Sequence, residues 1–105
     1  MNYEPEEEMR PDSRMREGER WWESYNEWMG KALCWLSLWK LRSQQFEAAV
    51  LGGTAPPAAM LRLSKAMDRA HDMHICALEN ADQAEECARA SEIAAQILWE
   101  EAEGR

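Results

Sequence analysis

The feature of this sequence that most limits its fold is a pair of mainly apolar stripes, one on each side of a short Gly/Pro-rich break. In both stripes the spacing alternates between three and four residues, which places the members on one face of an α-helix. Each stripe therefore predicts a long amphipathic helix. The first stripe contains Trp21, Tyr25, Trp28, Ala32, Trp35, Trp39, Arg42, Phe46 and Ala49. The second contains Met60, Leu63, Met67, Ala70, His74, Ala77, Ala81, Ala84, Ala88, Ser91, Ala95 and Leu98.

The break between the stripes reads Gly-Gly-Thr-Ala-Pro-Pro and predicts a loop at about 52–57. Glycine favours the end of a helix and proline the start of the next one. We expect helices at about 12–51 and 58–103. Gly30 weakens the first helix and could bend it, whereas the second helix is expected to continue through Asn80.

The first eleven residues have a different character from the rest of the chain. They contain two prolines and the run Glu6-Glu7-Glu8. We interpret residues 1–11 as a flexible acidic arm and 12–105 as a single helical domain, which suits a chain of 105 residues.

The two stripes are complementary in side-chain size. If the chain folds back at the loop, facing residues have numbers that sum to about 109. Large residues of the first helix then meet mostly small residues of the second, as close packing of two helices requires. The predicted pairs include Trp21 with Ala88, Trp28 with Ala81, Trp35 with His74 and Trp39 with Ala70. The sequence therefore predicts an all-α fold, a long antiparallel helical hairpin.

A single seam between two helices buries little surface, so a second contact is expected. Further apolar residues flank the stripes: Trp22, Met29, Leu33, Leu36, Ile75, Leu78, Ile93, Ile97 and Trp99. They could complete a four-helix bundle within one chain, if a helix bends, or between two chains in a homodimer. They could also bind a foreign protein.

Charge is unevenly distributed along the chain. Residues 1–30 carry nine acidic and four basic side chains, residues 31–69 carry two and six, and residues 70–105 carry nine and two. A hairpin brings the two acidic segments together at its open end. We predict a surface there that binds a basic protein or ribonucleoprotein, with aromatic anchors among its carboxylates. Its residues are Glu17, Glu19, Trp22, Glu23, Glu27, Glu85, Glu86, Glu92 and Trp99.

The sequence contains no pattern typical of an enzyme, a cofactor site or a metal site. There is no phosphate-binding glycine loop. The positions of the first helix that pair with His71 and His74 are Trp35 and Trp39, which are not metal ligands, so we expect His74 against Trp35 and His71 in solvent. The formal net charge of −8 argues against direct nucleic-acid binding. Three cysteines without framework spacing fit a reducing cytoplasm, and the apolar runs are too short to span a membrane.

In its small size, its Glu6-Glu7-Glu8 arm, its Glu-rich helix ends and its lack of catalytic motifs, the chain resembles small acidic proteins of phages and mobile elements, among them the anti-CRISPR proteins. This resemblance implies an inhibitor that occupies a basic, nucleic-acid-binding surface of a host effector complex. The Lys/Arg-rich segment near the loop departs from a uniformly acidic mimic and favours a mixed interface. The alternative function is an oligomeric helical adaptor or assembly factor, as in phage packaging or secretion.

Overall fold

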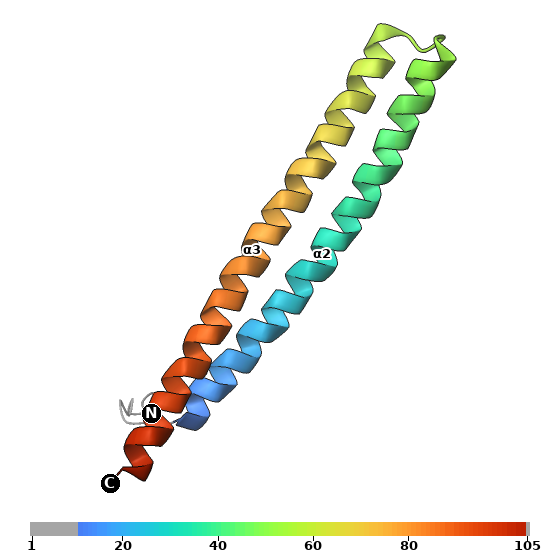
Figure 1. Ribbon diagram of the computed structural model, residues 1–105. Helices are drawn as coiled ribbons and strands as arrows, with labels where there is room; N and C mark the ends of the chain where they lie inside the picture. Colours follow the sequence, from blue (N-terminus) through green and yellow to red (C-terminus); the bar gives the residue numbers. More distant parts are fainter. Residues whose placement is uncertain (1–10, 105) are drawn as a thin grey trace, which may run out of the picture. The chain divides into compact units, whose positions relative to one another are not determined.

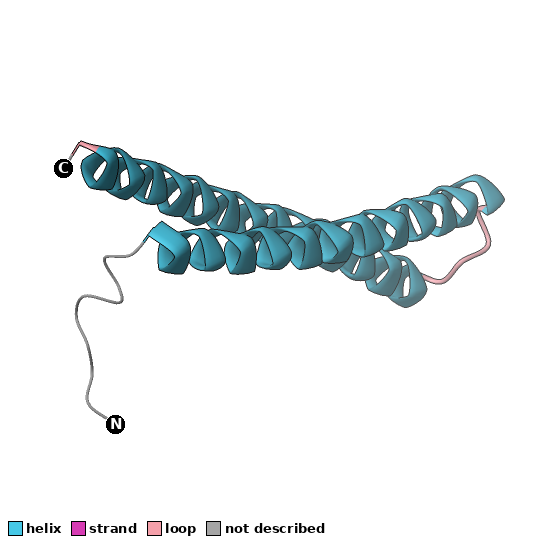
Figure 2. Ribbon diagram, turned by 90° about the horizontal axis from the view of Figure 1, so that it is seen from below, coloured by secondary structure: helices cyan, strands magenta, loops and turns pink. Residues whose placement is uncertain are grey.

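The computed structural model describes residues 11–104, which form two long helices, α2 (Pro11–Gly52) and α3 (Pro57–Glu103). Figure 1 shows both helices, and Figure 2 shows that helix accounts for nearly all of the described chain. The predicted all-α helical hairpin, with antiparallel helices, is confirmed. Both helices are uninterrupted at Gly30 and at Asn80. The predicted acidic arm, apart from Pro11, lies outside the described residues.

The turn between the helices follows the predicted glycine and proline chemistry. Gly53 has a φ of +66°, and its N–H donates a hydrogen bond to the carbonyl of Ala49 at 3.2 Å. This is the left-handed residue that satisfies a carbonyl at a helix end. At the other side of the turn, the carbonyl of Pro56 accepts hydrogen bonds from the N–H groups of Ala59 and Met60. These bonds start α3.

Replacing Gly30 in α2 and Gly53 in the turn with alanine should change the stability of the protein in opposite directions. Gly30 is exposed and an added Cβ would meet no atom within 4 Å, so Gly30→Ala should stabilise the helix by about 0.5–1 kcal/mol. Gly53→Ala should destabilise by about 1 kcal/mol, because an L-residue is strained at a φ of +66°. Urea denaturation followed by circular dichroism measures both, and equal effects of the two substitutions would contradict this account.

The described residues divide into two compact units. The terminal unit contains the start of α2, up to Glu27, and the end of α3, from Asn80. The loop unit contains residues Trp28–Glu79. Within each unit the two helical segments run antiparallel.

The core of both units is built from small side chains. The buried residues are Gly18, Ala32, Ala70, Ala77, Ala81, Ala84, Ala88, Ser91 and Ala95. No large side chain among the described residues is fully buried, and Trp21 remains 37% exposed. The tryptophans of the predicted stripe thus border the seam instead of filling it, and the hairpin is closed mainly by alanines.

The register agrees with the predicted sum of about 109. In the terminal unit, a Cβ added at Gly18 would lie 3.6 Å from the Cβ of Ser91 and 3.6 Å from the carbonyl oxygen of Ala88. A Cβ at Gly18 would thus make ordinary van der Waals contacts with α3, which places Gly18 in the seam beside Ser91. The predicted pair of Trp21 and Ala88 has the same sum as Gly18 and Ser91, one helical turn further along the seam.

In the loop unit two histidines connect the helices. Nδ1 of His74 lies 2.8 Å from the carbonyl oxygen of Ala32 and donates to it. The ring of His71, which is exposed, lies 5.4 Å from that of Trp39. The hydrogen bond reaches the turn of α2 before Trp35, and the pairing of His74 with Trp35 stays a prediction.

Candidate protein-binding surface

The terminal unit is strongly acidic. Its described residues contain twelve Asp and Glu against four Lys and Arg, a formal net charge of −8. The loop unit contains four acidic and six basic side chains, a net charge of +2. The structure thus groups the predicted acidic residues of α2 and α3 into one compact unit. Glu19, Glu23, Glu27 and Glu86 are exposed there.

The predicted binding residues lie on more than one side of this unit. On α3 the seam residues are Ala88, Ser91 and Ala95, so Cys87 and Ala94 lie about 100° to one side of it and Arg89, Glu92 and Gln96 about 100° to the other. The first side is here called the cysteine flank and the second the arginine flank. The surface predicted from sequence is therefore two flanks and an outer face, not one continuous patch.

Glu17 lies on the cysteine flank. Arg14 donates a hydrogen bond to its carboxylate at 3.0 Å, and the ion pair is largely exposed. Both residues line a shallow hollow together with Trp21, Cys87 and Ala94. Arg14 thus partly neutralises the charge of Glu17. An exposed ion pair of this kind contributes little to the stability of the fold.

Trp22 is held in a network on the arginine flank. Its indole N–H donates a hydrogen bond to Glu92, its ring meets Tyr25 edge to face at 5.5 Å, and the guanidinium of Arg89 lies 6.0 Å from the ring. Glu85 accepts two hydrogen bonds from Arg89, at 2.7 and 3.2 Å. The hydrogen bond that Arg89 donates to Glu85, and then the negative charge of Glu85, raise the pKa of Arg89.

This network changes the roles expected for three predicted binding residues. Trp22, Glu85 and Glu92 are already bonded to neighbours in the chain, so they build the surface more than they offer free groups to a partner. The unpredicted member is Arg89, a cation inside the acidic surface. Its spacing of four residues after Glu85 is the usual one for an ion pair along a helix, and this signal was available in the sequence.

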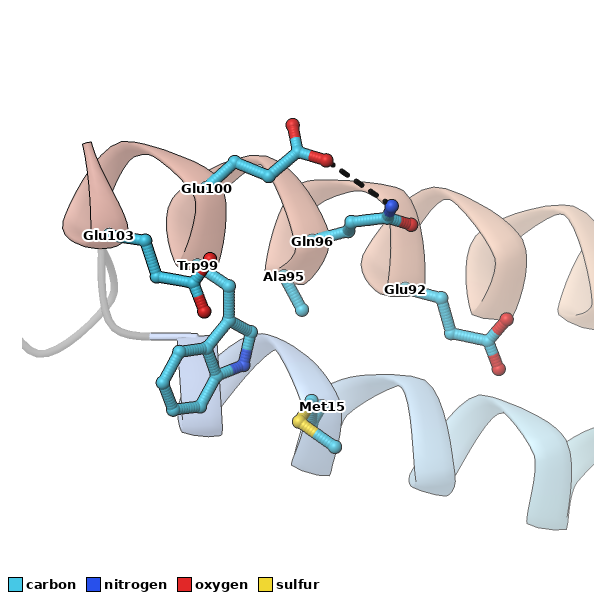
Figure 3. Close-up of a pocket in the computed structure, with 7 residues that line it drawn as sticks. All are labelled: Met15, Glu92, Ala95, Gln96, Trp99, Glu100 and Glu103. Atoms are coloured by element: carbon cyan, nitrogen blue, oxygen red, sulfur yellow. Dashed lines mark hydrogen bonds between the residues drawn. The ribbon is translucent and has the colours of Figure 1, made fainter.

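Trp99 lies at the end of the arginine flank, where α3 passes the first turns of α2. It is 46% exposed, and Met15 of α2 is 48% exposed. The two side chains line a hollow of about 500 Å³ with Glu92, Gln96, Glu100 and Glu103. Figure 3 shows the Trp99 ring reaching across toward α2, with Glu103 beside it and Glu92 at the opposite end. Gln96 donates a hydrogen bond to Glu100 at 3.3 Å.

No cluster of three or more His, Cys, Asp or Glu in residues 11–104 could hold a metal ion. In the same part of the chain neither helix contains a segment that is both long and apolar enough to cross a membrane.

Comparison with known protein families, with curated proteins and with solved structures finds no match to this chain.

Proposed function

We propose that this chain is a non-enzymatic, protein-binding inhibitor of the anti-CRISPR type. Its acidic terminal unit would occupy a basic, nucleic-acid-binding surface on a host effector complex. The partner would be a basic protein or a ribonucleoprotein complex, and the chain would not itself bind nucleic acid.

The observation that supports this proposal is the charge of the terminal unit. A net charge of −8 within the described part of one compact unit produces a negative potential that attracts a basic surface and speeds association with it. Helix stability does not explain the charge, because Glu100, Glu101 and Glu103 lie at the C-terminal end of α3, where the helix dipole disfavours anions. Binding of a basic partner would explain why these carboxylates lie at this end of the helix, whereas solubility would be served by carboxylates at any exposed position.

A second candidate, an oligomeric helical adaptor or assembly factor, is favoured by the small-residue core. Seven alanines account for the buried apolar side chains, whereas Leu33, Ile93 and Ile97 are 59%, 60% and 49% exposed. A hairpin with this little burial gains stability when a further helix covers it. Because residues 11–104 form two uninterrupted helices, a four-helix bundle would be completed by a second copy and not by a bend within one chain.

Affinity capture from host lysate at low and at high salt separates the two candidates. For the inhibitor we expect one nucleic-acid-binding complex at low salt that is lost at high salt, because exposed charge contacts are screened. Recovery of the chain's own copies alone, or of partners that persist at high salt, would reject the acidic-surface proposal and support the adaptor, whose contacts are apolar.

A further inference from the structure

The hollow between Met15 and Trp99 has the chemistry of a site for one kind of side chain. Its two walls are apolar and about half exposed, and Ala95 lies at its base. Three carboxylates line it, those of Glu92, Glu100 and Glu103, and no Lys or Arg among residues 11–104 does. An acidic ligand would be repelled, and a purely apolar one would leave these carboxylates without a counter-ion.

We propose that this hollow binds the side chain of an arginine or lysine from a basic segment of the partner protein. The aliphatic stem would lie along Met15 and Ala95, and the cation would lie over the Trp99 ring beside the carboxylate of Glu103, with the charge of Glu92 attracting it from the other end of the hollow. A cation within about 6 Å of a tryptophan ring is attracted by the ring, and long cationic side chains bury their stems on apolar surfaces. This inference rests on the proposed function and names the group that the acidic unit recognises.

The chain itself contains pairs of the kind proposed. The ammonium of Lys31 lies 4.4 Å from the centre of the Trp28 ring, and the guanidinium of Arg89 lies 6.0 Å from that of Trp22. In the second pair, Glu85 and Glu92 hold the cation and the ring through hydrogen bonds. Trp99 likewise is exposed and has a carboxylate beside its ring, that of Glu103, but among residues 11–104 no Lys or Arg lines its hollow. A partner's cation would complete it.

The test is a titration of the ¹⁵N-labelled full chain with capped hexa-arginine, followed through the tryptophan indole N–H resonances. Trp99→Phe identifies the Trp99 resonance. We expect this resonance to move on binding, and Trp99→Ala to weaken binding about tenfold. A Trp99 resonance that does not move while the peptide binds would place the peptide elsewhere and overturn the proposal.

Two pairs of substitutions separate a specific site from general attraction. Glu92→Gln with Glu103→Gln removes two charges from the hollow and leaves an oxygen to accept the Trp22 hydrogen bond. Glu86→Gln with Glu101→Gln removes two exposed charges from the same helix outside the hollow. We expect the first pair to weaken peptide binding about five- to tenfold and the second about twofold or less. Circular dichroism shows whether both variants keep the wild-type helix content.

The outcomes distinguish this inference from the function on which it rests. If both pairs weaken binding equally, the hollow is rejected while the acidic surface still attracts cations. If hexa-arginine does not bind at all, both proposals fail. If the chain self-associates without peptide and the first pair abolishes this, the occupant is a second copy and not a basic partner.

Discussion

Replacing Ala88 with glutamate is expected to unfold the terminal unit. Ala88 is fully buried, and its carbonyl oxygen is 3.6 Å from where a Cβ on Gly18 would stand. A longer side chain there must force the helices apart, and its charge would lose water without gaining a partner. We expect a loss of about 3 kcal/mol or more in the free energy of unfolding, measured by urea denaturation and far-ultraviolet circular dichroism.

Ala90→Glu is the matched control for this prediction. Ala90 lies two residues further along α3 and is exposed. The same substitution there adds the same charge to the same helix, yet the free energy of unfolding should change by about 0.5 kcal/mol or less. If the two variants unfold at the same urea concentration, the seam between the helices is not as closely packed as the structure indicates.

The hairpin could be predicted because its two stripes are long and keep their alternating spacing without interruption. The register followed from the loop, since Gly52 and Pro57 fix where the chain turns. The pairing of Gly18 with Ser91 obeys the same sum. Gly18 lies three residues before Trp21, so it extends the first stripe by one position.

The details of the acidic surface were harder to predict, because they depend on the angular position of each residue around its helix relative to the seam. Neighbours in sequence can lie on different flanks, so a list of glutamates does not define one face. Glu17 and Glu92 were expected to act together, and the structure places them on opposite flanks. Met15 was missed because only the tertiary contact with Trp99, 84 positions later in the sequence, turns it into the wall of a hollow.

Reversing Glu19, Glu23 and Glu27 together to lysine is expected to abolish capture of the partner complex. These three residues are exposed, and spaced four apart along α2 they share one side of the helix. The net charge of the described terminal unit would change from −8 to −2. Lysines facing a basic partner replace attraction with repulsion, so we expect affinity at low salt to fall about 100-fold, measured by surface plasmon resonance against the captured complex.

The control reverses three exposed acidic residues of the loop unit, Glu47, Asp68 and Asp72, to lysine. This variant has the same total charge as the first, but its terminal unit is unchanged. If the acidic terminal unit makes the contact, the control should bind within roughly threefold of wild type, since charges away from an interface are screened over about 10 Å. Equal losses in both variants would mean that total charge, not this surface, attracts the partner. No loss in the first variant would mean that the contact is apolar, because only a surface that does not use these carboxylates could tolerate their reversal.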